Sequence, residues 1–143
     1  MKGKEVSEQE QAFVRIRSTW AAAASDPSRL ASLFYANLFR IDHSTRPLFV
    51  GDLVLQGRKL AQTLNFIVDN LHDEETLVPA AKELAIRHVD YGVTADQYGS
   101  VGAALIETLT QLLGPTFGEE DKQAWLDTYA KLSSVMVEAA YPE

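Results

Sequence analysis

Residues 74–93 read EETLVPAAKELAIRHVDYGV and include the histidine on which the interpretation of the whole chain depends. Three apolar residues precede His88 by eleven, seven and four positions, so all of them share one face of a predicted helix. They are Leu77, Ala81 and Leu84. Gly92 predicts that this helix ends just after the imidazole. Because neutral imidazole is the commonest protein ligand for metals, His88 is either a metal ligand or a hydrogen-bonded core residue.

Working outward, the rest of the chain has the same helical period, and no useful length alternates with the period of two that strands require. Capping boxes at Ser7/Glu10 and Thr94/Gln97 and the pair Asp26-Pro27 predict helix starts. The pattern predicts an all-α fold with six to eight helices, the others being residues 7–24, 26–41, 54–71, 94–113 and 125–139. Residues 42–51 contain Pro47 and Gly51 and are expected to form a short irregular connection.

Length and composition indicate one globular domain over residues 1–143, with residues 1–6 as a polar tail. No stretch is apolar enough to span a bilayer, and no signal-peptide core follows the N-terminus, which predicts a cytoplasmic location. The chain has no cysteine, which excludes disulfides, thiolate metal sites and thiol catalysis. A net charge of −7 argues against nucleic acid as a partner.

Six segments resemble, in order and spacing, those of bacterial single-domain globins, flavohaemoglobin haem domains and Vitreoscilla-type haemoglobins. They are Trp20, residues 34–39 (FYANLF), 46–49 (RPLF), 87–93 (RHVDYGV), 97–102 (QYGSVG) and 124–129 (AWLDTY). The resemblance runs from about Ser7 to Tyr141 and implies a three-over-three globin fold. The full-length first helix and the absence of paired glycines distinguish the chain from truncated globins.

The resemblance also implies a cofactor, haem b (iron protoporphyrin IX), with His88 as the metal ligand. A single protein ligand leaves the opposite position open to dioxygen, CO or NO. His43 and His72 lie in polar segments and are expected to face solvent.

Further site residues follow from the same resemblance. Tyr35 and Gln56 fall at the distal positions and can donate hydrogen bonds to the ligand, with Leu60 one helical turn beyond the glutamine. Alternatively, the Tyr35 hydroxyl binds a backbone carbonyl within the core, and Gln56 faces solvent. The expected haem contacts are Phe49, Leu60, Val93, Tyr98 and His88. Lys59 or Arg58 either reaches a haem propionate or is solvated at the surface.

The chain departs from flavohaemoglobins on the side of the histidine. In that family a tyrosine and a glutamate polarise the histidine. Tyr98 has the spacing of the tyrosine, but Ala140 takes the place of the glutamate, and Glu138 is expected to point elsewhere. The chain ends at Glu143 with no reductase domain after it, so continuous turnover is expected to need an external reductase.

The implied function is reversible binding of dioxygen with high affinity, for storage, transport, delivery or scavenging. One alternative is a nitric oxide dioxygenase that detoxifies nitric oxide with an external reductant. Another is a haem-based sensor or electron-transfer globin with an internal sixth ligand. The chain is expected to be a monomer or a weak homodimer, without nucleic-acid or membrane partners.

Overall fold

A computed structural model describes residues 7–141, which contain six α-helices, two 3₁₀ helices and no strand. The elements are α1 (Glu8–Ala23), α2 (Pro27–Ile41), η2 (His43–Leu48), α3 (Leu53–Asp69), α4 (Glu74–Asp90), α5 (Gln97–Leu113), η3 (Gly114–Thr116) and α6 (Glu119–Ala140). The predicted all-α fold is therefore confirmed. The polar tail predicted for residues 1–6 lies outside the described residues.

Short-range chemistry sets where the first two helices begin. The Ser7 side chain accepts a hydrogen bond from the Glu10 amide, and the Glu10 carboxylate bonds back to Ser7, as the capping box predicts. The Asp26 carboxylate accepts a bond from the Arg29 amide, with Pro27 at the first helical position.

Three predicted boundaries are wrong, one of them the start of the last helix, since α6 begins at Glu119 rather than near Trp125. Residues 42–51 are not irregular throughout, because His43–Leu48 form the 3₁₀ helix η2, which the Asp42 carboxylate caps through the Ser44 amide at 3.0 Å. Helix α5 begins at Gln97 rather than Thr94. Only half of that capping box forms: the Gln97 side chain accepts from the Thr94 amide at 2.9 Å, and no side chain caps the helix itself.

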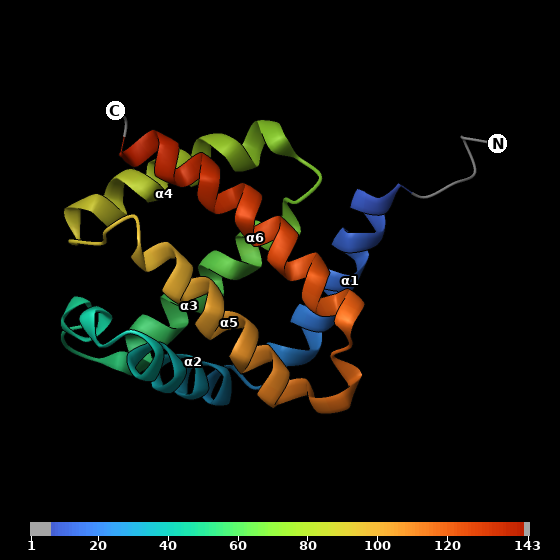
Figure 1. The fold of residues 1–143 in the computed structure, drawn as a ribbon, viewed down its shortest axis with the longest axis horizontal. Helices are drawn as coiled ribbons and strands as arrows, with labels where there is room; N and C mark the ends of the chain where they lie inside the picture. Colours follow the sequence, from blue (N-terminus) through green and yellow to red (C-terminus); the bar gives the residue numbers. More distant parts are fainter. Residues whose placement is uncertain (1–6, 142–143) are drawn as a thin grey trace.

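The helices pack in crossing layers (Figure 1). Helix α5 packs on α2, α6 packs on α4 at one end and on α1 at the other, and α3 crosses α2 and α1. Two helix crossings, α2 with α3 and α5 with α6, are close enough to require glycine. A Cβ on Gly57 would lie 2.6 Å from the Ala31 Cβ, and one on Gly102 would lie 2.6 Å from the Tyr129 ring.

Buried side chains form two clusters of unequal size. The main cluster joins α1, α2, α3, α5 and α6 and includes both tryptophans. The smaller one joins the end of α4, the start of α5 and the end of α6 around Ala81, Ala85, Tyr98 and Met136. Among the described residues, no helix is long and apolar enough to cross a membrane.

Candidate functional site

Helix α4 presents His88 in its last turn. The apolar stripe predicted for this helix turns inward, with Leu77 and Ala81 buried. The helix ends at Asp90, and the chain reverses at Gly92, whose φ of +92° suits glycine. The Val93 amide donates back to the His88 carbonyl at 3.0 Å. The predicted break after the imidazole is confirmed.

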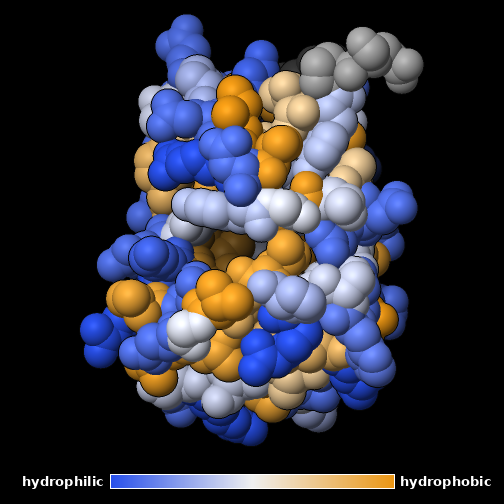
Figure 2. All heavy atoms as spheres, turned by 90° about the vertical axis from the view of Figure 1, so that its left-hand side faces the viewer, coloured by the Kyte–Doolittle hydropathy of each residue, from blue (hydrophilic) through white to orange (hydrophobic). Residues whose placement is uncertain are grey.

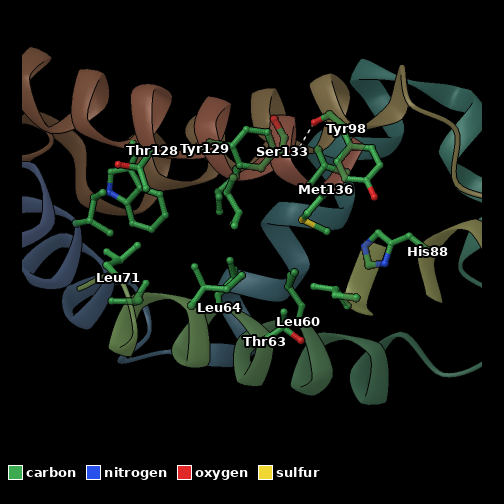
Figure 3. Close-up of a pocket in the computed structure, with 18 of the residues that line it drawn as sticks. Leu60, Thr63, Leu64, Leu71, His88, Tyr98, Thr128, Tyr129, Ser133 and Met136 are labelled. Carbon is green, nitrogen blue, oxygen red and sulfur yellow. Dashed lines mark hydrogen bonds between the residues drawn. The ribbon is translucent and has the colours of Figure 1, made fainter. Parts of the chain in front are cut away.

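His88 lies at one end of an apolar cavity of about 150 Å³. Leu60 and Leu64 follow one another along α3, Leu71 comes just after its end, and Tyr129 and Met136 face them from α6 (Figure 3). Three residues predicted to lie together with His88 line this same cavity: Leu60, Val93 and Tyr98. The structure therefore joins α3, α4, α5 and α6 around the imidazole.

Two buried polar atoms at this end of the cavity have no hydrogen-bond partner in the described part of the chain, the His88 Nδ1 and the Tyr98 hydroxyl. The two rings are neighbours, with centroids 6.0 Å apart. Burial is the main cause that lowers the pKa of His88, and the neighbouring Arg87 charge lowers it further. The Leu84 carbonyl one turn earlier acts in the opposite direction and raises the pKa, although it makes no well-aligned hydrogen bond, so the net shift is downward. His88 is therefore neutral at physiological pH, the form that binds metals.

Tyr98 keeps its hydroxyl proton in this environment. Burial, followed by the neighbouring Tyr141, raises the pKa of Tyr98 to about 12. The Tyr141 hydroxyl donates to the Val93 carbonyl. Ala140 is half-buried and Glu138 is exposed, so among the described residues no carboxylate hydrogen-bonds to Tyr98 or His88.

A second group of predicted residues gathers around Tyr35. Its ring lies edge-on to Phe49 at 5.1 Å and stacks on Phe39 at 5.9 Å, so α2 and the segment after η2 are joined by aromatic contacts. Tyr35 is buried, and burial raises the pKa of its hydroxyl to about 12. Within residues 7–141 this hydroxyl makes no hydrogen bond, so the alternative in which it binds a backbone carbonyl is not realised.

Neither Tyr35 and Phe49 nor the remaining distal candidates line the His88 cavity. Gln56 is half-buried on α3, whereas Arg58 and Lys59 are exposed, and none of the three side chains has a polar partner in the described range. Leu60, one turn beyond Gln56 on α3, does line the cavity. His43 and His72 are exposed, as expected.

Sequence reasoning missed the far end of the cavity. Beyond Leu64 the space continues between α3 and α6 to Ile16 and Trp125, with Thr128 in its wall, whereas the hydroxyl-bearing residues Thr63 and Ser133 border the part nearer His88 (Figure 3). The apolar stripe of α6 indicated Trp125 as a core residue. Nothing in the spacing of the polar residues indicated that they border a cavity.

The surface is hollowed on one side. The face on the left of Figure 1, where α4 ends and η2 lies, has a hollow near its middle, and hydrophobic side chains border it (Figure 2). The exposed fractions of Val89 and Tyr91 at the end of α4 are 40% and 65%.

The helical architecture, with one half-buried histidine facing an apolar cavity, is suited to an α-helical protein that holds a prosthetic group. The globin family matches residues 32–136 of the chain. The chain therefore belongs to the globin family.

Relatives agree with this assignment. The chain is 28% identical over 126 residues to the Globin-2 B chain of Anadara inaequivalvis, covering 80% of this chain and 83% of that protein. It is 26% identical over 131 residues to a flavohemoprotein of Chromobacterium violaceum, covering 90% of this chain but 32% of that protein. The chain thus spans about a third of the flavohemoprotein it matches.

Solved structures share the fold. A bacterial globin from Campylobacter jejuni superposes with a TM-score of 0.77 at 23% identity, over 92% of this chain and 95% of that one. An engineered carbene transferase, a putative nitric oxide dioxygenase from Rhodothermus marinus, also gives a TM-score of 0.77, at 26% identity over 92% and 91% of the two chains.

Membership of the globin family implies binding of haem and of small diatomic ligands, and the residues present fit that group. The described residues contain no cluster of three metal-ligating side chains, so no bare metal ion site is built. A single neutral imidazole without a well-aligned hydrogen bond, in an apolar cavity, suits a metal whose other ligands come from a macrocycle.

Proposed function

We propose that the chain binds haem b through His88 and binds dioxygen reversibly and tightly at the remaining open position. When bound, the haem supplies an iron centre that takes up a diatomic ligand. The observation that carries the proposal is the half-buried His88 imidazole, which faces an apolar cavity and whose buried Nδ1 has no well-aligned polar partner in the described part of the chain. Phe49, Leu60, Val93 and Tyr98 are the proposed apolar and aromatic contacts, with Lys59 beside a propionate.

On the distal side we assign the ligand contacts to Tyr35 and Gln56. A hydroxyl with a pKa of about 12 stays protonated at neutral pH and can donate a hydrogen bond to dioxygen. The absence of any competing acceptor for Tyr35 within residues 7–141 supports this role. A hydrogen bond in a dry pocket is worth on the order of 1–3 kcal/mol, or about five- to a hundredfold in affinity.

The test is the visible absorption spectrum of the haem-reconstituted protein in its ferric, ferrous and ferrous-CO forms. We expect a broad high-spin ferrous spectrum that sharpens on addition of CO, as a five-coordinate iron gives. Sharp paired bands in the ferrous protein without added ligand would instead indicate an internal sixth ligand and a sensor or electron-transfer role. A failure to take up haem would overturn the proposal.

A second candidate is nitric oxide dioxygenase activity supported by an external reductase. The relatives favour it, since one is a flavohemoprotein and another a putative nitric oxide dioxygenase. The exposed Glu138 and the half-buried Ala140 leave His88 without the carboxylate that the flavohaemoglobin pattern has there. Nitric oxide consumption with added reductase should therefore be slow compared with dioxygen binding. Nitric oxide consumption as fast as dioxygen binding would instead indicate that catalysis is the main function.

Three further expectations stay predictions: one domain over residues 1–143, a cytoplasmic location and a monomer or weak homodimer. Size-exclusion chromatography with light scattering tests the oligomeric state.

A further inference from the structure

A second hollow lies away from His88, between α2, η2 and the first two turns of α3. This groove encloses about 650 Å³, within the roughly 300–1,000 Å³ typical of small-molecule sites. None of its lining residues lines the His88 cavity, which uses the later turns of α3. The groove is therefore a separate site in the described part of the molecule.

The wall of the groove is largely apolar. Ala31 and Gly57 meet where α2 crosses α3, and Leu53, Phe39 and the Tyr35 ring extend the surface on either side. Such a wall suits the hydrocarbon part of a ligand, because burying apolar surface there is favourable.

Charge around the groove opposes the charge of the whole protein. Residues 26–59, from the N-cap of α2 to the second turn of α3, contain five basic and three acidic residues, a net charge of 5 − 3 = +2, in a chain whose net charge is −7. All three acidic side chains already have partners: Asp26 caps the Arg29 amide, Asp42 binds Ser44 and Ser100, and Asp52 caps the Val54 amide. In the part of the chain that the structure describes, none of the five basic side chains pairs with a carboxylate.

Two of these cations line the groove. The Arg46 guanidinium lies over the Phe39 ring, 4.9 Å from its centroid, and Nη1 donates to the Phe49 carbonyl at 3.2 Å, which fixes the charge at the groove. Arg58 is exposed and has no polar partner among residues 7–141.

We propose that this groove binds an amphipathic organic anion, a carboxylate with an aliphatic body. The body lies on the apolar wall between α2 and α3, and the carboxylate meets Arg46 and Arg58, whose guanidinium groups match it geometrically. This goes beyond gas binding at His88, since the ligand is of another chemical class and lies in a groove that shares only the Tyr35 ring with the residues assigned to gas binding.

The experiment is a calorimetric titration of the haem-loaded, CO-bound protein with octanoate, with CO blocking the iron. We expect one octanoate site, with its affinity lowered at least about fivefold in Arg58→Gln and in Arg46→Gln, the effect of losing a charge-assisted hydrogen bond at an exposed rim. Arg29→Gln, an exposed position on α2 outside the groove, is the matched control and should bind like the wild type. Octanol should bind more weakly than octanoate in the wild type.

Three outcomes overturn the proposal: no octanoate binding, equal affinity in the Arg46→Gln/Arg58→Gln double variant, or octanol binding as tightly as octanoate. A protein that fails to take up haem is titrated as purified, because the groove consists of α2, η2 and α3 alone. The same three results then decide whether the groove binds octanoate. A protein that does not bind haem can therefore still confirm or overturn the proposal about the groove.

Discussion

The region around His88 and the region around Tyr35 each hold a polar side chain without a well-aligned partner in residues 7–141, but they are built differently. The half-buried His88 lies beside Tyr98 of the small cluster at the ends of α4 and α6, where a few residues of local sequence fix the helix end. Tyr35 belongs to the main core, where aromatic rings from α2 and from beyond η2 hold it.

The difference separates two kinds of site construction. The His88 region is held by the turn at Gly92, and two of its buried polar atoms, the His88 Nδ1 and the Tyr98 hydroxyl, have no partner in the described residues. We therefore expect binding of the prosthetic group to stabilise this region. The Tyr35 side is packed independently of any ligand, so its hydroxyl is preorganised. Substitutions near His88 should therefore affect cofactor retention, and substitutions at Tyr35 should affect ligand kinetics.

The largest expected effect is the loss of haem in His88→Ala. Removing the proposed iron ligand should abolish stable haem incorporation, and added imidazole should partly restore it. The Soret absorbance after gel filtration measures retention, and His43→Ala, at an exposed position, is the control. Full haem retention by His88→Ala would assign the iron to another residue and leave His88 as a core histidine.

Which features of the fold the sequence predicts depends on how far apart along the chain the residues that determine them lie. The capping box at Ser7, the Asp26-Pro27 start and the helix end after His88 depend on residues within a turn of one another, and all three were predicted. The apolar stripes predicted the all-α fold. The family resemblance predicted that Leu60, Val93 and Tyr98 lie together with His88, and in the structure all four line one cavity.

Long-range contacts explain what was missed. The capping of η2 depends on Asp42, whose carboxylate also accepts a bond from Ser100, 58 residues further along the chain. The contact between Tyr35 and Phe49 and the far end of the cavity at Ile16 arise from packing between helices. The spacing of residues along one sequence does not predict contacts between segments that lie so far apart in it.

Next in size is the effect of Tyr35→Phe on the distal region. Losing one hydrogen bond to dioxygen should speed dioxygen release by at least about tenfold, while CO, a weaker acceptor, should be released at a rate near that of the wild type. Stopped-flow displacement measures both rates. Equal dioxygen release in the two proteins would mean that the phenol points away from the ligand and that only packing holds it.

The close-approach glycines test whether the two regions tolerate strain differently. Gly102→Ala would place a Cβ 2.6 Å from the Tyr129 ring and should destabilise the fold by about 1–3 kcal/mol. Gly57→Ala meets the Ala31 Cβ at the same distance and should cost a similar amount. Gly99→Ala, on the same helix as Gly102 and with open space, is the control and should stabilise by about 0.5–1 kcal/mol. Urea unfolding that ranks Gly102→Ala with Gly99→Ala would contradict the α5–α6 packing.

A smaller and opposite pair of effects is expected at two tyrosines near His88. Tyr98→Phe removes a buried hydroxyl without a partner in the described residues, so stability should stay equal or rise by up to about 1 kcal/mol. Tyr141→Phe removes the hydrogen bond to the Val93 carbonyl and should lower stability by about 1 kcal/mol. Urea midpoints of the haem-free proteins give the comparison. A marked loss of stability in Tyr98→Phe would reveal a partner for its hydroxyl.

The smallest effect concerns Asp42, which links the two regions by capping η2 on the Tyr35 side and binding Ser100 on α5. Hydrogen bonds from the Ser100 and then the Ser44 hydroxyl lower the pKa of Asp42 in the folded protein. A lowered folded-state pKa means that the stabilisation is complete above the unfolded pKa of about 3.9 and disappears as the pH falls through the folded value. Wild type should therefore exceed Asp42→Asn in urea midpoint at neutral pH, and the gap should close in acid. A gap that persists unchanged in acid would mean that the carboxylate charge plays no part and that the two regions are joined by packing alone.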